Sequence, residues 1–363
     1  MSGERICVNP VATEGRTEEL PLNLFVDFER APYINQVRPY QVEVELTSKC
    51  AGSCRYCYAS STTATEIFLP TERVLRLINE SAELGVQKMC WMGGDPQLHR
   101  DWYDIVRYAA DKGLKNFFIT SGLLSREDIR KLCRLGDAIE AVTIHIDTID
   151  PEDYAVLHAN PKTREQKMQG YRSLLEAGYP SAKVGNCITV TQANARSIPQ
   201  TIDWFVDEMG SPCILLIAFK GEGFGGAHHD WEPTVEQFRQ VAEHRARKLG
   251  DFWLRMGSMD AVMYYCRSTF TIQYDGSVSP CPCVRDLRKG NILQEGLREI
   301  YQRNADDLLY NAPIKGPCGT CDNRDVCFGC RATAYHYTGD VYASDPKCFL
   351  NPEAKDRMLP CRM

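Results

Sequence analysis

Between residues 41 and 220, six short apolar segments alternate with helix-like segments, and this alternation limits the possible folds more than any other feature of the chain. The strands are predicted at 41–47, 88–94, 116–120, 141–147, 183–190 and 213–219. The helices are predicted at 70–85, 101–113, 125–136, 163–178 and 197–210, each ending at a glycine, a common helix stop. Such alternation predicts an α/β fold with a parallel sheet and right-handed crossovers. The pattern alone is compatible with a doubly wound sheet and with a partial (β/α) barrel.

The alternation stops after residue 220. The later elements are a glycine-rich loop, a helix, a hairpin that turns at Asp275-Gly276, and another helix, predicted at 220–230, 232–250, 269–281 and 297–310. The remainder is cysteine-rich loop. We therefore divide the chain into an N-terminal extension, a core, and a C-terminal part made of a helix and a cysteine-rich domain, at 1–40, 41–230 and 231–363.

The bulk composition is that of an ordinary globular protein, with 363 residues, 44% hydrophobic and 25% charged. The net charge of −6 argues against a nucleic-acid-binding surface, which is usually basic. No apolar run reaches the roughly 18 residues of a membrane span, and the N-terminus has no apolar signal segment. We therefore expect a cytoplasmic protein without nucleic-acid or membrane partners.

Seventeen cysteines are far more than such a protein needs for its core. In a reducing compartment, clustered cysteines more often bind metal or carry out redox chemistry than form disulfides. One group is Cys50, Cys54 and Cys57. The second group comprises Cys266, Cys281, Cys283, Cys318, Cys321, Cys327, Cys330 and Cys348. The cysteines in apolar strands, such as Cys90, Cys187 and Cys213, are interpreted as buried structural thiols.

The first group directly follows the first predicted strand, on the rim where α/β enzymes usually place their chemistry. A four-iron cluster needs four ligands, so three thiolates leave one iron open. Zinc is the alternative, but a structural zinc normally takes four nitrogen or sulfur ligands, and no histidine lies near this loop. The spacing therefore favours an iron–sulfur cluster with an open iron.

Cys-x3-Cys-x2-Cys, with Tyr56 before the last cysteine, resembles the signature of the radical S-adenosylmethionine (SAM) superfamily. Gly93-Gly94-Asp95-Pro96 resembles the family's GGEP segment, with Asp in place of Glu, and Thr120-Ser121-Gly122 resembles its TNG segment. The resemblance covers residues 41 to about 220 and implies a partial (β/α)6 barrel. The residues that it places at SAM are Tyr56, Gly93, Gly94, Asp95, Thr120, Ser121, His145 and Asn194, where His145 replaces a frequent serine.

The resemblance also implies the chemistry. The open iron would chelate SAM, and one electron from the reduced cluster would cleave it to a 5′-deoxyadenosyl radical. That radical would abstract hydrogen from an unreactive C–H bond. The electron would come from an external donor of the flavodoxin or ferredoxin kind.

The second cysteine group resembles the SPASM extension of radical SAM enzymes, with x2 instead of x3 between Cys327 and Cys330. The resemblance implies two auxiliary [4Fe–4S] clusters. One would be held by Cys318, Cys321, Cys327 and Cys348, and the other by Cys266, Cys281 and Cys330. The fourth ligand of the second cluster stays open between Asp260, Cys283 and no protein ligand. Zinc knuckles are the alternative for these CxxC pairs.

The substrate is the least determined feature. SPASM-bearing enzymes mostly modify peptides or proteins, so we expect a radical oxidoreductase that acts on a peptide or protein. The alternative is a dehydrogenase or epimerase of a small sugar-like or amino-sugar-like molecule, and a non-catalytic metal-binding scaffold ranks below both. Pro282 stands where sulfatase-maturing enzymes carry an Asp base, which argues against that activity. Only about 40 residues precede the first strand, so a peptide leader would have to bind elsewhere or through a partner.

No catalytic base can be assigned from the sequence. Cys283, Asp260, His228 and His229 are candidates for moving a proton or hydrogen atom. Packing at the end of the hairpin accounts equally well for Cys283, and a solvated loop accounts equally well for the other three.

Overall fold

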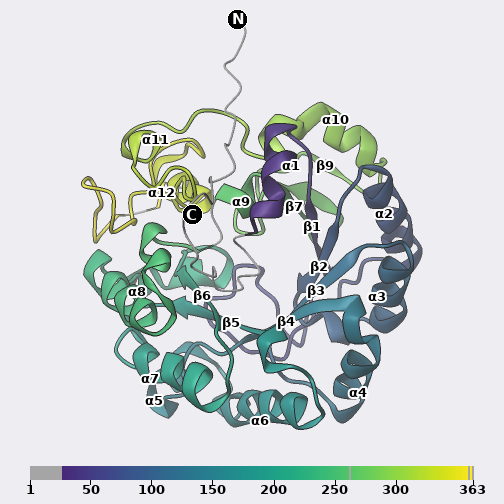
Figure 1. The fold of residues 1–363 in the computed structure, drawn as a ribbon, viewed down its shortest axis with the longest axis horizontal. Helices are drawn as coiled ribbons and strands as arrows, with labels where there is room; N and C mark the ends of the chain where they lie inside the picture. The colour runs from purple at the N-terminus through teal and green to yellow at the C-terminus, as the bar shows by residue number, and fades with distance from the viewer. Residues whose placement is uncertain (1–26, 261–262, 359, 362–363) are drawn as a thin grey trace, which may run out of the picture.

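The computed structural model describes residues 27–260, 263–358 and 360–361. The described strands form one nine-stranded sheet in the order β6-β5-β4-β3-β2-β1-β7-β8-β9. Strands β1 to β6 are parallel to their neighbours and curve around a common axis, with helices on the outside (Figure 1). The expected partial (β/α)6 barrel is confirmed, and the doubly wound alternative is wrong because the sheet curls instead of staying open between two helix layers.

The elements have the following bounds. The strands are β1 Gln41–Thr47, β2 Lys88–Gly93, β3 Lys115–Thr120, β4 Ile139–His145, β5 Val184–Val190, β6 Cys213–Ala218, β7 Thr269–Ile272, β8 Ser277–Ser279 and β9 Gly290–Asn291. The helices are α1 Ala31–Asn35, α2 Thr71–Glu83, α3 Trp102–Asp111, α4 Arg126–Leu135, α5 Pro151–Leu157, α6 Thr163–Glu176, α7 Ile198–Asp203, α8 Val235–Leu249, α9 Met263–Cys266, α10 Leu297–Leu308, α11 Pro317–Thr320 and α12 Arg331–Thr338.

Strand β1 shows how the sequence sets the two faces of the barrel wall. Val42, Val44 and Leu46 are fully buried in the core that joins the strands to the outer helices. Glu43 and Glu45 alternate with them and are also buried. Since side chains of a strand alternate between faces, these two carboxylates point into the barrel. The barrel interior is therefore partly polar.

The predicted strands agree with the structure to within about two residues at each end. The predicted helix at 197–210 is an α-helix only to Asp203 and continues as a π-helical turn at Trp204–Glu208. Helix α5 was not predicted, although Asp150 caps it by accepting from the backbone N–H groups of Glu152 and Asp153. A seven-residue helix is too short to show clear periodicity.

The predicted hairpin is also present, since β7 and β8 are antiparallel. Unexpectedly, β7 pairs in parallel with β1, with Val42 opposite Phe270, so the hairpin extends the barrel sheet. The C-terminal part thereby shares hydrogen bonds with the first strand of the barrel. The predicted limits at residues 40 and 230 stay predictions, and residues 1–26 of the extension lie outside the described part.

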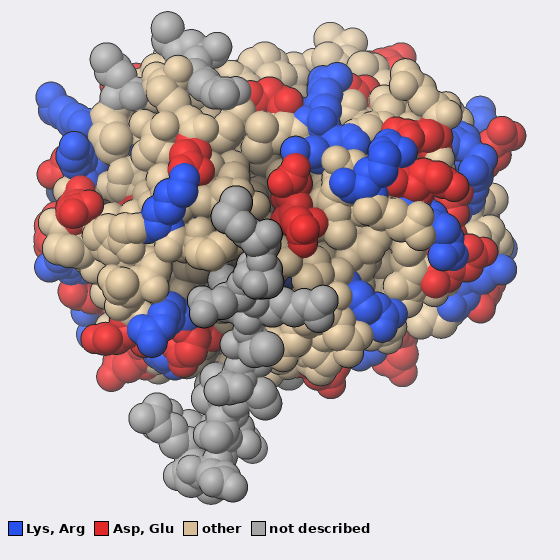
Figure 2. Space-filling view, turned by 90° about the horizontal axis from the view of Figure 1, so that it is seen from above, with Lys and Arg blue, Asp and Glu red and all other residues tan. Residues whose placement is uncertain are grey.

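Charged side chains of both signs are intermixed on the face that Figure 2 shows. A surface of this kind does not single out a strongly charged partner. Within the described residues, no helix has the length and apolar character that a membrane crossing requires.

Candidate functional site

The first three cysteines lie on the loop that follows β1. Cys50, Cys54 and Cys57 are partly buried and form no disulfide. Backbone N–H groups point at two of the sulfurs, because Gly52 N donates to Cys50 Sγ (3.2 Å) and Ser61 N to Cys57 Sγ (3.5 Å). Such bonds favour the thiolate, which is the form that binds metal, but burial outweighs them and raises the pKa of both thiols in this metal-free state. The loop therefore suits the ligation of an iron–sulfur cluster.

Two cationic side chains face Cys54. Burial raises the pKa of the Cys54 thiol, but the charges of His158 and Lys167 outweigh it and hold that pKa well below its usual value. Lys167 is fully buried on α6, and its Nζ donates to the carbonyl oxygen of His145 (3.1 Å). The surroundings of this thiol thus favour its metal-binding form.

The residues after α5 hold the cysteine loop in place. Ala159 N donates to the carbonyl oxygen of Ser53 (2.9 Å). His158 is fully buried, with Nδ1 at 3.1 Å from the carbonyl oxygen of Gly52 and Nε2 at 3.1 Å from Asp147 Oδ2. The imidazole therefore joins the cysteine loop to the segment that follows β4.

The glycine pair after β2 packs directly against the cysteine loop. Gly94 N donates to the carbonyl oxygen of Thr47 (2.7 Å), and Asp95 N to that of Lys49 (2.8 Å). A Cβ atom on Gly94 would lie 2.0 Å from Lys49 O. Glycine is required there because the two backbones approach too closely for a side chain.

Asp95 connects this segment with the end of β3. Its carboxylate accepts hydrogen bonds from Ser121 N (2.7 Å), Ser121 Oγ (2.8 Å) and Thr120 Oγ1 (3.3 Å). Cys50 Sγ lies 3.5 Å from Asp95 Oδ2. The cysteine loop and the segments after β2 and β3 thus meet at one place on the barrel rim.

Tyr56 and His145 meet at the same rim. The Tyr56 hydroxyl lies 2.8 Å from His145 Nε2, which in turn lies 3.1 Å from Asp147 Oδ1. Tyr56 also donates to the carboxylate of Asp147. Burial disfavours the imidazolium of His145, but the charge of Asp147 outweighs this and raises its pKa well above the usual value.

Asn194 lies at the same end of the barrel but is fully buried. Its Oδ1 accepts from Thr191 N (2.8 Å), and its Nδ2 donates to the carbonyl oxygens of Thr189 (2.9 Å) and Asp147 (3.4 Å). The amide therefore ties β5 to the end of β4. Its predicted contact with SAM stays a prediction.

Four C-terminal cysteines line one cavity of about 510 Å³ between α11, the start of α12 and the C-terminal segment: Cys318, Cys321, Cys327 and Cys348. The N–H groups of Asp345, Asn323 and Gly329 donate to the sulfurs of Cys318, Cys321 and Cys327 at 3.4 Å each. A Cβ atom on Gly257 would lie 2.0 Å from Cys348 Sγ, so glycine makes room for this thiol. These four residues are the set predicted to hold one auxiliary cluster.

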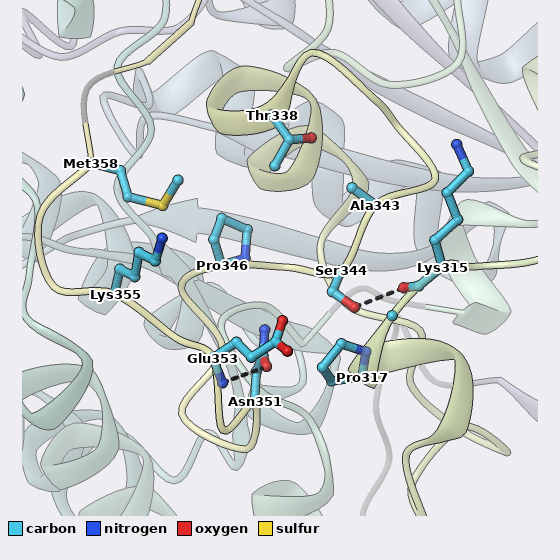
Figure 3. Close-up of a pocket in the computed structure, with 11 residues that line it drawn as sticks. Lys315, Pro317, Thr338, Ala343, Ser344, Pro346, Asn351, Glu353, Lys355 and Met358 are labelled. Carbon is cyan, nitrogen blue, oxygen red and sulfur yellow. Dashed lines mark hydrogen bonds between the residues drawn. The ribbon is translucent and has the colours of Figure 1, made fainter.

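A second pocket of about 630 Å³ adjoins this cavity (Figure 3). Pro317 and Asn351 line both. Ser344 Oγ donates to the carbonyl oxygen of Lys315 (2.7 Å), and this bond closes one side of the second pocket. The two cavities are therefore neighbours that share these two residues.

The remaining cysteines of the second group gather where the hairpin faces α9 and α12. Cys330 packs with Cys281 and Cys283, and Cys283 N lies 3.4 Å from Cys281 Sγ. Burial and the thiolate of Cys330 raise the pKa of Cys266. Cys266, Cys281 and Cys330 are thus close neighbours in the structure although up to 64 positions separate them in the sequence.

Among the described residues, no three or more His, Cys, Asp or Glu side chains are gathered tightly enough to hold a single metal ion. A mononuclear zinc site with Zn–S bonds of about 2.3 Å would need such a group. The zinc alternatives for the cysteine groups stay predictions.

Comparison with known families agrees with this geometry. Residues 44–205 match the model of the radical SAM superfamily, and residues 265–331 match the iron–sulfur cluster-binding (SPASM) domain. The chain therefore carries a radical SAM domain. It carries a SPASM domain after the radical SAM core.

Similar proteins match both parts of this radical SAM chain. An AdoMet-dependent heme synthase of Methanosarcina barkeri is 26% identical over 87% of the chain and 98% of its own length. A PqqA peptide cyclase of Streptomyces rochei is 28% identical over 86% of the chain and 90% of its own length. The crystal structure of Streptococcus suis SuiB bound to S-adenosylmethionine has the same fold, with a TM-score of 0.65 and 15% identity over 88% of the chain and 81% of that chain.

As a radical SAM enzyme with a SPASM domain, the protein uses SAM and [4Fe–4S] clusters as cofactors. The residues present fit these groups, because thiols with N–H donors lie at the barrel rim and in the C-terminal cavity. The individual ligands and SAM contacts given above remain predictions.

Asp260 is engaged elsewhere. Its carboxylate accepts from Leu216 N (2.6 Å) and forms a buried ion pair with Arg245 of α8. Iron ligation by Asp260 would leave the Arg245 guanidinium buried without this partner, which is costly. Cys283 lies beside Cys281 and needs no such exchange, so we favour it over Asp260 as the fourth ligand.

Sequence reasoning missed several side chains near the cysteines. His158, Lys167 and Lys220 are buried beside cysteines that lie far away in the sequence. The Asp150-Pro151 pair, typical of a helix start, was the one local signal for α5, which brings His158 to the cysteine loop. Lysines within a helix or after a strand give no comparable signal.

Proposed function

We propose that this radical SAM enzyme is an oxidoreductase that abstracts hydrogen from a peptide or protein substrate. The observation that carries the proposal is the similarity to PqqA peptide cyclases, which extends over 86% of the chain. The solved complex of SuiB with its precursor peptide SuiA is compatible with it at the level of fold. The product would be a cross-linked, oxidised or epimerised peptide.

In this proposal Cys50, Cys54 and Cys57 hold the cluster that binds SAM. When bound, the reduced cluster and SAM supply a 5′-deoxyadenosyl radical, which takes hydrogen from an unreactive C–H bond. Asp95 and Ser121 fix the two rim segments beside this site, and Tyr56, His145 and Asp147 contact one another at the same rim.

The two C-terminal groups of cysteines hold auxiliary clusters in this proposal. Cys318, Cys321, Cys327 and Cys348 hold one of them. Cys266, Cys281 and Cys330 hold the other, with Cys283 as its fourth ligand. Clusters held by these cysteines would supply an acceptor for the electron that remains after hydrogen abstraction, and an external flavodoxin-like or ferredoxin-like protein would supply the electron that starts the reaction. A cytoplasmic location suits such oxygen-sensitive cofactors.

A second candidate is supported by the AdoMet-dependent heme synthases, which match the chain at 26% identity. In that case the substrate is a small molecule, a heme precursor, rather than a peptide. Like the alternative predicted above, this candidate acts on a small molecule, but that alternative was a sugar-like or amino-sugar-like one.

Anaerobic reconstitution followed by analysis of iron and products tests the proposal. Three four-iron clusters correspond to about twelve irons per chain. With reductant, SAM and a small peptide encoded beside the gene, we expect 5′-deoxyadenosine together with a peptide of altered mass. Conversion of a heme precursor with no change in the peptide would decide for the second candidate. Absence of 5′-deoxyadenosine with every substrate would contradict both.

A further inference from the structure

Exposed large apolar side chains are concentrated around the first cysteine loop. Among the described residues, six such side chains are between 37% and 47% exposed: Ile67, Phe68, Leu98, Val156, Phe224 and Leu293. Five of them lie on segments whose backbone is hydrogen-bonded to residues 47–57, and the sixth, Leu293, lies beside the hairpin turn at Gly276. Apolar surface that is exposed in one region of a protein in this way marks a place where another molecule binds.

Phe224 is held directly against the cysteine loop. It lies in the glycine-rich loop that follows β6, and its backbone N donates to the carbonyl oxygen of Cys57 (3.0 Å). A Cβ atom on Gly223 would lie 2.5 Å from that oxygen and 2.3 Å from the carbonyl oxygen of Tyr58. The two backbones are therefore in close contact, and the position of Phe224 relative to Cys57 is fixed.

Two residues earlier, the same loop is fixed to the second cysteine group. Glu222 Oε1 accepts from Arg285 N (3.2 Å), two positions after Cys283. His336 Nε2 lies 3.1 Å from Glu222 Oε2 and 2.7 Å from the carbonyl oxygen of Cys283. The short stretch from Glu222 to Phe224 therefore connects the first cysteine loop with the hairpin cysteines.

This stretch lies where the proposed function needs the substrate. In that proposal the substrate loses a hydrogen atom beside the first cysteine group and an electron to the side of the second group. Its reacting part must therefore lie between the two groups. Phe224 is 39% exposed on a backbone that is fixed to both sides. An aromatic ring held in this way offers apolar contact area to a ligand.

We propose that Phe224 is a specificity-determining residue, which contacts the peptide substrate and favours an apolar side chain beside the modified position. Moving an apolar side chain from water onto the ring is favourable, whereas a polar side chain gains nothing there. The inference rests on the proposed function, because it names a contact of the peptide substrate.

Steady-state kinetics of the reconstituted full-length protein test this role, with the small peptide encoded beside the gene as substrate. Phe224→Ala removes the ring and retains the backbone bond to Cys57. The KM for the peptide should rise about tenfold, while kcat changes much less. Phe224→Leu keeps an apolar contact and should restore most of the affinity. The SAM dissociation constant and the iron content should equal those of the parent chain in both variants.

Leu293→Ala is the matched control. Leu293 is 45% exposed, so this variant also removes an exposed apolar side chain, but one beside the hairpin turn. Its KM should equal that of the parent chain. The proposal is overturned if Phe224→Ala leaves KM unchanged, or if Leu293→Ala raises KM as much. Loss of iron or of SAM affinity in Phe224→Ala indicates a structural role and also overturns it.

The preference for an apolar side chain is tested by changing the peptide. Replacing the apolar residue that flanks the modified position by serine should raise KM for the parent chain but not for Phe224→Ala, since the ring that it contacts is then absent. Equal increases in KM for the two chains would show that this peptide residue does not contact Phe224.

Photo-cross-linking detects the contact without turnover. With benzoylphenylalanine in place of Phe224, irradiation with SAM and the peptide, but without reductant, should give a covalent adduct that mass spectrometry detects. The same replacement of Leu293 should give none. Absence of an adduct at position 224 refutes the contact. If the parent chain does not modify the peptide, the proposed function fails and the inference fails with it, whereas normal turnover with an unchanged KM in Phe224→Ala refutes the inference alone.

Discussion

Asp95 shows how a single side chain organises the barrel rim. The related segment carries Glu, and the shorter Asp still reaches three donors on Ser121 and Thr120. It is 1% exposed, so these hydrogen bonds are shielded from water. A buried carboxylate with several donors both stabilises the fold and fixes the donors' positions.

Replacing Asp95 by alanine should therefore weaken both stability and cofactor binding. We expect the free energy of unfolding to fall by about 1.5–3 kcal/mol, because buried donors on Ser121 lose a charged acceptor. The SAM dissociation constant should rise in the same variant. Urea unfolding and equilibrium SAM binding under anaerobic conditions measure the two effects.

The control for this change is Asp137→Ala. Asp137 is fully exposed and pairs with Lys183 on the surface, so neither property should change noticeably. If the Asp95→Ala variant is as stable as the wild type, the three hydrogen bonds do not hold the rim together.

At the scale of elements, the end of β2 and the cysteine loop determine each other's backbone path. Gly94 lies so close to Lys49 that no side chain fits between them. On the other side, the residues after α5 hold the same loop through His158 and Ala159. The cysteine loop is thus clamped between two segments that lie 44 and over 100 positions further along the chain.

Gly94→Ala should disturb the cysteine loop more than the fold. The new Cβ would lie 2.0 Å from a backbone oxygen, so the loop must shift. We expect the SAM dissociation constant to rise roughly tenfold or more, which corresponds to about 1.4 kcal/mol. Isothermal titration with the reconstituted protein measures it, and circular dichroism checks that the fold persists.

Gly113→Ala is the control for Gly94→Ala, because it introduces backbone strain without a steric clash. Gly113 has φ +79°, but nothing lies within 4 Å of its Cβ position. This variant should lose roughly 1 kcal/mol of stability and retain its SAM affinity. Equal SAM affinities of the two variants would show that the close contact at Gly94 does not control the site.

At the scale of the whole molecule, a buried ion pair joins the barrel to the segment after the hairpin cysteines. Arg285 donates to both carboxylate oxygens of Glu45 inside the barrel (2.6 and 3.0 Å). Tyr274 N also donates to Glu45 (3.1 Å), and the Arg285 guanidinium lies over the Tyr274 ring. The pair connects β1, which leads to the first cysteine group, with the residues that follow Cys283.

Arg285→Ala should be strongly destabilising, because it leaves the fully buried Glu45 carboxylate without its cation. We expect a loss of about 3–5 kcal/mol in the free energy of unfolding, measured by urea unfolding. Adding Glu45→Gln to the same chain should restore part of the loss, since the unpaired charge is then absent. If the loss in the free energy of unfolding of the double variant equals the sum of the losses of the two single variants, the two residues do not interact.

The sequence by itself determined the parallel α/β core, the approximate bounds of its strands, the family and the cofactors. These follow from local patterns: apolar runs ended by glycines, and the spacings of Cys50, Cys54 and Cys57 and of the later cysteines. Cofactor binding that depends on such spacing can be predicted from the sequence without a structure.

Only the tertiary structure decided which distant residues complete the site. It joined β7 to β1, engaged Asp260 with Arg245, and brought His158, Lys167 and Lys220 to the cysteines. None of these contacts has a local signature, because a buried lysine or carboxylate is recognised by what surrounds it. Those surroundings come from strands and loops that meet only when the barrel has formed.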